Sequence, residues 1–78
     1  SNEIPDFNSE EEFRVYLAGS LRTACICRGI RQTDLAKSIG VPREQLNRYF
    51  NGIQPIPSYI LYKMLQTLGI LFSDLMSE

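Results

Sequence analysis

The sequence predicts an all-α fold in which five helices form one compact domain. Apolar residues recur at intervals of three and four positions, as they do on one face of an amphipathic helix, without the alternation of a strand. Glycine or proline stands between these segments, where helices commonly end or begin. The chain has 78 residues, of which 44% are hydrophobic and 22% charged. This length and composition suit a single globular domain rather than a disordered chain.

The first helix is predicted to begin after Ser9 and to run to about Cys27. Ser9 and Glu12 have the spacing of a capping box, in which the serine hydroxyl accepts from a backbone N–H of the first turn. Gly29 suits the left-handed conformation that ends a helix, and Gly19 is a candidate position for a break. The apolar stripe of this helix comprises Phe13, Tyr16, Leu17, Leu21, Ala24 and Cys25.

Two short helices are predicted next, over about residues 32–39 and 43–50. Gly40 ends the first of them, and Pro42 stands where a helix often begins because its missing N–H costs nothing in the first turn. Asn51-Gly52 ends the second. Their apolar faces comprise Leu35, Ala36, Ile39, Leu46, Tyr49 and Phe50.

A fourth helix is predicted to open at Pro57-Ser58 and to end at Gly69, and a short fifth helix to cover about residues 72–77. Their core residues are expected to be Ile60, Leu61, Met64, Leu65 and Leu68, followed by Phe72, Leu75 and Met76. Residues 1–8 are predicted to be an N-terminal tail, whose Ser1-Asn2 start resembles a tag remnant, and residues 9–78 the domain.

The composition argues against catalysis, metal binding and a membrane span. The chain contains no histidine, which is the commonest general base and metal ligand. Cys25 and Cys27 lie two residues apart in a predicted helix, so they face different directions, and a zinc site would need about four such ligands. No apolar run approaches the roughly 18 residues of a membrane span, and no export signal is visible. We expect a cytoplasmic protein that is not an enzyme and needs no cofactor or metal.

Charge is distributed unevenly along the chain. Residues 1–12 carry five acidic and no basic residues, residues 13–63 carry all eight basic residues against two acidic ones, and residues 64–78 carry two acidic residues. The net charges of these segments are −5, +6 and −2, within a total of −1. A basic central segment favours contact with a polyanion, although a solvated helical surface also carries scattered arginines and lysines.

Residues 32–52 have the features of a helix-turn-helix, two helices of about eight residues joined by a short turn. Ala36 is small enough for a close helix crossing, and Gly40 tolerates a positive φ in the turn. Leu46 and Tyr49 anchor the second helix and leave its other side free. The outward residues of that helix are Arg43, Glu44, Gln45, Asn47 and Arg48.

These outward side chains have the chemistry that reads base pairs. Arginine binds guanine O6 and N7, asparagine or glutamine binds adenine N6 and N7, and glutamate accepts from cytosine N4. A face that is merely solvated would more often carry lysine, glutamate and alanine. The pattern therefore favours recognition of double-stranded DNA.

Residues 20–76 resemble the helix-turn-helix domain of the phage repressor and Cro family, also called the xenobiotic-response-element family. The resemblance rests on the Gln-x-x-Leu-Ala-x-x-x-Gly pattern of residues 32–40, on Asn51-Gly52, and on Pro57-Ser58 at the start of the fourth helix. It implies a lambda-repressor-like fold, a helix from Arg43 that enters the major groove, and a homodimer on paired half-sites.

The resemblance also implies a role for individual residues. The positions that contact bases are those of Arg43, Glu44, Asn47 and Arg48. The positions expected at a DNA phosphate are those of Gln32 and Asn51, and the position of Gln45 more often supports or touches the backbone. Arg31 stands where the family prefers a serine or threonine cap, and a cation there is unfavourable unless a phosphate binds beside it. We therefore expect Arg31 and Gln32 to clamp a phosphate, the alternative being an arginine tolerated at an exposed cap.

The chain departs from the family pattern at several positions. The family often carries an arginine–glutamate ion pair at the positions of Cys25 and Phe50, which are both apolar here, so the pair is replaced as a unit. Leu71 replaces a polar cap and forms, with Met76, either an exposed patch at a dimer interface or part of the core. The acidic segment 1–18 is either an arm that binds a protein partner or a longer first helix.

Two functions from different classes follow from these features. The first is a sequence-specific DNA-binding transcriptional regulator, of repressor or antitoxin type. The second is a protein-interaction module that keeps the helix-turn-helix frame without binding DNA, which the acidic N-terminal segment and the pI near 5.3 favour. DNA binding that weakens steeply with salt would favour the first.

Overall fold

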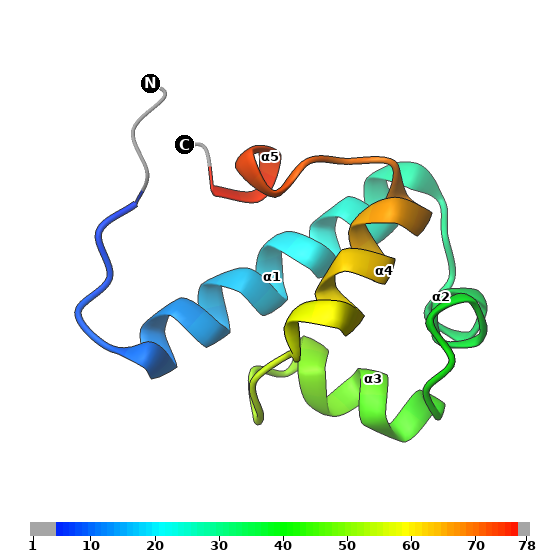
Figure 1. The fold of residues 1–78 in the computed structure, drawn as a ribbon, viewed down its shortest axis with the longest axis horizontal. Coiled ribbons are helices and arrows are strands. Elements are labelled where there is room, and N and C mark those ends of the chain that lie inside the picture. The colour runs from blue at the N-terminus through cyan, green and yellow to red at the C-terminus, as the bar shows by residue number, and fades with distance from the viewer. Residues whose placement is uncertain (1–4, 77–78) are drawn as a thin grey trace.

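Five helices follow one another along residues 5–76, the part of the chain that the computed structural model describes (Figure 1). They are α1 (Glu10–Arg28), α2 (Gln32–Ile39), α3 (Arg43–Phe50), α4 (Ser58–Leu68) and α5 (Phe72–Met76). The predicted all-α, five-helix fold is confirmed, and α2 and α3 have the predicted bounds. The suggested tag remnant at Ser1-Asn2 and the predicted last helical residue, Ser77, lie outside the described residues.

The ends of α1 follow from local hydrogen bonding. The backbone N–H of Glu12 donates to Ser9 Oγ at 3.1 Å, which satisfies one of the free donors of the first turn. Gly29 has a φ of 65° and closes the helix. The helix runs unbroken through Gly19, so the break considered there is absent. None of the helices among residues 5–76 is long and apolar enough to cross a membrane.

The helices are arranged so that α3 is free on one side. α1 is the long central helix, and α3 and α5 pack against it from opposite sides (Figure 1). α2 packs mainly against α4 and also against α3. The helix-turn-helix pair therefore forms one end of the molecule, away from α5.

The core is built from the predicted apolar stripes. Its most completely buried side chains are Leu21, Leu35, Ile39, Leu46, Phe50 and Met64. Cys25 is also buried, which raises the pKa of its thiol, whereas Cys27 is exposed, so the two cysteines face different directions as predicted. Phe7, in the predicted tail, packs edge to face on Phe13 and Tyr16, with ring centroids 5.4 and 5.1 Å away. The packed part of the chain thus begins before Ser9.

The C-terminal helix differs from the prediction in its orientation. Met76 is 5% exposed and belongs to the core, so of the two alternatives for this residue the core is confirmed and the exposed patch with Leu71 is excluded. Phe72 was expected in the core, but its side chain is 41% exposed. Leu71 is exposed, as a place in an interface patch requires. A five-residue helix has little periodicity to orient it, so the path of the chain after Gly69 decides which side faces inward.

Gly52, in the turn between α3 and α4, is expected to tolerate no side chain. Its φ is 67°, and a Cβ at this position would lie 3.1 Å from Cγ2 and 3.2 Å from Cα of Val15 in α1. The left-handed backbone costs about 1–2 kcal/mol for a residue with a Cβ, and overpacking adds about 1–3 kcal/mol. Gly52→Ala should therefore lower the free energy of unfolding in urea by about 2–5 kcal/mol.

Gly19 supplies the matched control. It lies inside α1, and a Cβ there would meet nothing within 4 Å. Gly19→Ala should raise the free energy of unfolding by about 0.5–1 kcal/mol, because alanine loses less backbone entropy in a helix. Equal effects of the two substitutions would contradict the close approach of the turn to Val15.

Candidate nucleic-acid interface

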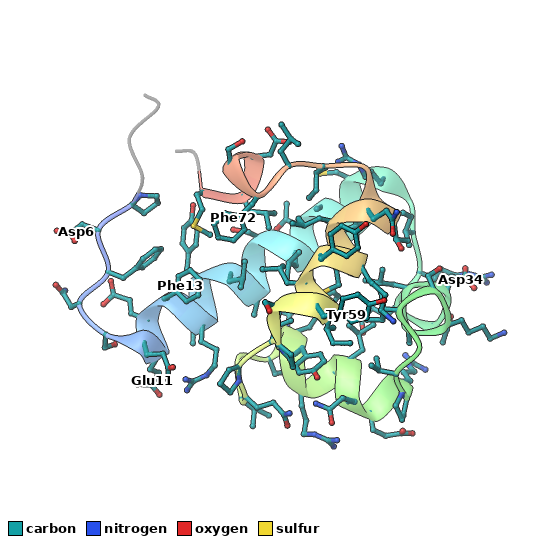
Figure 2. The ribbon with its side chains drawn as sticks, in the orientation of Figure 1. Asp6, Glu11, Phe13, Asp34, Tyr59 and Phe72 are labelled. Carbon is teal, nitrogen blue, oxygen red and sulfur yellow. The ribbon has the colours of Figure 1, made fainter. Side chains whose placement is uncertain are left out.

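The four residues that the sequence analysis expects to contact DNA bases lie together on the exposed face of α3. Leu46, Tyr49 and Phe50 are buried and fix the helix to the core. Residues 43, 44, 47 and 48 are all exposed, and their spacing puts them on one helical face. On the outer side of α3, the drawn side chains point away from the other helices (Figure 2). This face, made of Arg43, Glu44, Asn47 and Arg48, is called the recognition face below.

Within residues 5–12, the acidic N-terminal segment leaves the recognition face uncovered, since the four residues of that face are exposed. Asp6 and Glu11 lie at one end of the long axis of the molecule, whereas Asp34 of α2 lies at the other end (Figure 2). Phe7 holds the segment against α1 through its ring contacts. The recognition face is therefore accessible in the described monomer.

Arg48 is held by two glutamine side chains. Its Nε donates to Gln54 Oε1 at 3.1 Å, and its Nη2 donates to Gln45 Oε1 at 2.6 Å. The Nε2 of Gln45 is buried and has no hydrogen-bond partner among the described residues. In this arrangement Gln45 Oε1 contacts Arg48 and Gln45 Nε2 is shielded from solvent, so Gln45 supports a neighbouring side chain in the described structure.

Two arginines of α1 tether the end of α3. Arg22 Nη2 donates to the carbonyl oxygen of Phe50 and, at 3.0 Å, to Asn51 Oδ1. Arg14 Nε donates to the carbonyl oxygen of Gly52 at 2.8 Å. These carbonyls follow the last turn of a helix, where cations are favoured. Two of the eight basic residues therefore serve the fold, a role that sequence reasoning missed although both stand on α1 eight residues apart.

Asn51 and Asn47 are linked within the chain. Asn51 Nδ2 donates to Asn47 Oδ1 at 3.3 Å, and Asn51 Oδ1 accepts from Arg22. The amide of Asn51, expected at a phosphate, thus has both of its ends in contacts within the protein. The bond uses the Oδ1 acceptor of Asn47, an exposed residue, and not its Nδ2 donor.

The N-terminus of α2 carries an ion pair that the sequence reading overlooked. Arg31 is the N-cap residue and makes no capping bond, but its Nε lies 3.1 Å from Asp34 Oδ2. Asp34, in the first turn, places a negative charge where the helix dipole favours one. The signal was the spacing of three between an arginine and an aspartate. Gln32, the first residue of α2, is half-buried beside them.

A second surface of the molecule is apolar. Tyr59 and Tyr62 of α4 stack with ring centroids 6.1 Å apart, and both are exposed. Tyr62, Leu71 and Phe72 line a hollow of about 440 Å³ together with Leu65 and Ile70. This α4–α5 apolar surface, made of Tyr59, Tyr62, Leu71 and Phe72, contains the residue Leu71 that the sequence placed at a dimer interface.

Comparisons with known proteins agree with this architecture. A helix-turn-helix family model matches residues 21–75. No curated protein sequence matches significantly. Among solved structures, the clp gene regulator ClgR from Corynebacterium glutamicum has a TM-score of 0.77 and 24% identity over 80% of this chain, which spans 66%, just under two thirds, of that chain.

Two further solved structures share the fold. The restriction-modification controller protein C.AhdI from Aeromonas hydrophila has a TM-score of 0.75 and 22% identity, and the match covers 81% of this chain and 96% of that one. The hypothetical transcription factor NHTF from Neisseria has a TM-score of 0.74 and 23% identity, with 97% and 88% covered. At these identities the likeness shows the arrangement of the five helices.

Proposed function

This chain belongs to the Cro/C1-type helix-turn-helix family of DNA-binding transcriptional regulators, and from that membership we propose that it reads one DNA sequence with the recognition face of α3. The observation that supports the proposal is the exposure of Arg43, Glu44, Asn47 and Arg48 on one side of a helix whose other side is buried. Members of this family act by binding DNA rather than by catalysis, in keeping with the expectation from composition. As a regulator that binds DNA, the chain is expected to act in the cytoplasm.

The phosphate contacts are proposed at α2 rather than after α3. Arg31 and Gln32 stand at the N-terminus of α2, where backbone N–H groups and the helix dipole favour an anion. Lys37 is exposed on the same helix and can approach the DNA backbone. Gln45, which contacts Arg48, and Asn51, which contacts Arg22 and Asn47, are proposed to position recognition residues instead.

The active form is proposed to be a homodimer joined through the α4–α5 apolar surface. Exposed tyrosine, leucine and phenylalanine side chains in one patch are typical of interfaces. This surface lies apart from the recognition face, so two copies can present two α3 helices to half-sites about 34–36 Å apart. A bound dimer of this kind acts as a repressor or as the antitoxin of a toxin–antitoxin pair. Met76 supports this surface from the core.

The alternative function, a protein-interaction module working through the acidic segment, has less support. Phe7 packs on α1, so the segment belongs to the domain and is not a free arm. Among the acidic residues of positions 5–12 that the structure describes, Glu10 pairs with Arg14, a neighbour on the same helix.

The proposed function is tested by binding to random and selected duplexes at several salt concentrations. We expect selection from a random pool to yield a paired half-site, and the affinity to fall roughly 1,000-fold between 50 and 200 mM salt if a dimer neutralises about six phosphates. Retention of DNA that is insensitive to salt, or a selected pool without any common sequence, would contradict the proposal.

Arg31→Ala is expected to weaken DNA binding without changing stability. Its ion pair with Asp34 is exposed, so the free energy of unfolding should change by less than about 0.5 kcal/mol. Loss of a phosphate contact should reduce the salt slope by about 0.9 for each contact removed. The measurement is the affinity for the selected duplex as a function of salt.

Arg28→Ala is the control for charge alone. Arg28 is also an exposed arginine, but it lines a hollow with Asp74 and Leu75 of α5, on the side away from α3. Its removal should leave the salt slope unchanged. Identical slopes for the Arg31 and Arg28 variants would remove Arg31 from the interface and leave it as an arginine tolerated at an exposed cap.

A further inference from the structure

One edge of the Arg48 guanidinium already donates hydrogen bonds within the protein. Nε donates to Gln54 Oε1 and Nη2 donates to Gln45 Oε1, at 3.1 and 2.6 Å. Gln45 lies one turn earlier on α3, whereas Gln54 lies in the loop that follows it. Arg48 is therefore held by two acceptors, one from α3 and one from the loop, which bind two nitrogens of its guanidinium.

The free edge has the geometry that guanine requires. A guanidinium is planar and carries five N–H donors in a fixed fork. With Nε and one N–H of Nη2 engaged, the donors left are those of Nη1 and the second N–H of Nη2, which form the end-on pair. Guanine presents two acceptors side by side in the major groove, O6 and N7, and the other bases do not.

The position of Gln45 lowers the stability of the folded protein. Its Nε2 is buried without a partner among the described residues, and an unpaired buried donor destabilises a folded protein. An apolar side chain of similar size would avoid that loss. The contact that Gln45 does make is with Arg48, so its chemistry is explained by the recognition face rather than by the core.

We propose that Gln45 and Gln54 are specificity-determining positioning residues, which hold Arg48 so that its end-on edge reads a guanine. The proposal rests on the proposed function, because it acts only when α3 lies in the major groove. Gln54 stands outside α3 and has no role in the sequence interpretation. The two glutamines act through Arg48 and do not themselves touch the base.

The test compares base preference in matched variants. The probe is the duplex selected by the wild-type protein, together with copies in which each guanine–cytosine pair is replaced in turn by adenine–thymine. Arg48→Ala identifies the position that Arg48 reads, where we expect the preference for guanine to fall about tenfold or more. Gln54→Leu and Gln45→Met should lower the preference at that same position at least threefold, and nowhere else.

Two readouts separate positioning from a structural role. The affinity for random duplex and the salt slope should stay unchanged in both glutamine variants, because no charge is lost. Gln45→Met should keep or raise the Tm, since it removes the unpaired donor. Gln54→Glu, which keeps an oxygen acceptor beside Nε, should retain the guanine preference while its negative charge lowers the overall affinity.

The outcomes distinguish this inference from the function on which it rests. A wild-type protein that selects no sequence would overturn both. A wild-type protein that selects a sequence, with glutamine variants that keep the preference of the Arg48 position within twofold, would overturn the positioning role alone. A base other than guanine at the Arg48 position would also overturn it.

Discussion

Replacing Arg43 and Arg48 together with alanine is expected to lower the affinity for the selected duplex by about 2–6 kcal/mol per half-site. Each bidentate contact with a base contributes about 1–3 kcal/mol of discrimination, and the two side chains stand more than one helical turn apart. Both are exposed, and the Arg48 guanidinium donates to the side chains of Gln45 in α3 and of Gln54 in the loop that follows. The free energy of unfolding should therefore change by less than about 0.5 kcal/mol.

The comparison with random duplex decides what the two arginines do. If they read bases, the double variant loses much more affinity for the selected duplex than for random DNA. Equal losses on both would assign the two side chains to phosphates. A fall in stability of several kcal/mol would instead show that the recognition face takes part in the fold. Titration calorimetry and urea unfolding measure the two quantities on the same preparation.

Phe50→Ala is expected to lower the free energy of unfolding by about 3–5 kcal/mol, the usual range for a buried aromatic residue. Phe50 is 1% exposed, packs in the core at the end of α3, and its carbonyl accepts a hydrogen bond from Arg22. A domain of this size has roughly 4–12 kcal/mol of total stability. The substitution should therefore unfold a measurable fraction of the protein and abolish DNA binding as a consequence.

Ile53→Ala is the matched control for the loss of apolar volume. Ile53 follows α3 by three residues but is 64% exposed, so its truncation should change the stability by less than about 0.5 kcal/mol. Urea unfolding compares the two variants. A loss below about 1 kcal/mol for Phe50→Ala would contradict its place at the centre of the contact between α1 and α3.

The helix-turn-helix could be predicted from sequence because its signals are local. Gly40 and Pro42 mark the end of α2 and the start of α3, and the buried residues of both helices recur at helical spacing. The same spacing predicts which residues of α3 face outward, since its inner face is unambiguous. Local sequence patterns thus predict where α2 and α3 begin and end and which residues of α3 are exposed.

The contacts that fix side chains on that face could not be predicted, because they join distant parts of the chain. Arg14 and Arg22 reach carbonyls 38 and 28 residues away, and the sequence gives no sign of the partner. Gln54 reaches Arg48 from an irregular loop. The burial of Met76 depends on how the chain runs from α4 to α5. A five-residue helix is too short for its apolar pattern to predict which side is buried.

The central claim is that α3 enters the major groove with its recognition face. The most direct measurement is an NMR titration of the labelled protein with the selected duplex, followed at the backbone amides. We predict that the largest shifts fall on residues 43–48 and on Arg31 and Gln32, and that the amides of residues 6–12 stay unchanged. Shifts concentrated on the acidic segment or on the outer side of α1, with α3 unaffected, would contradict the account.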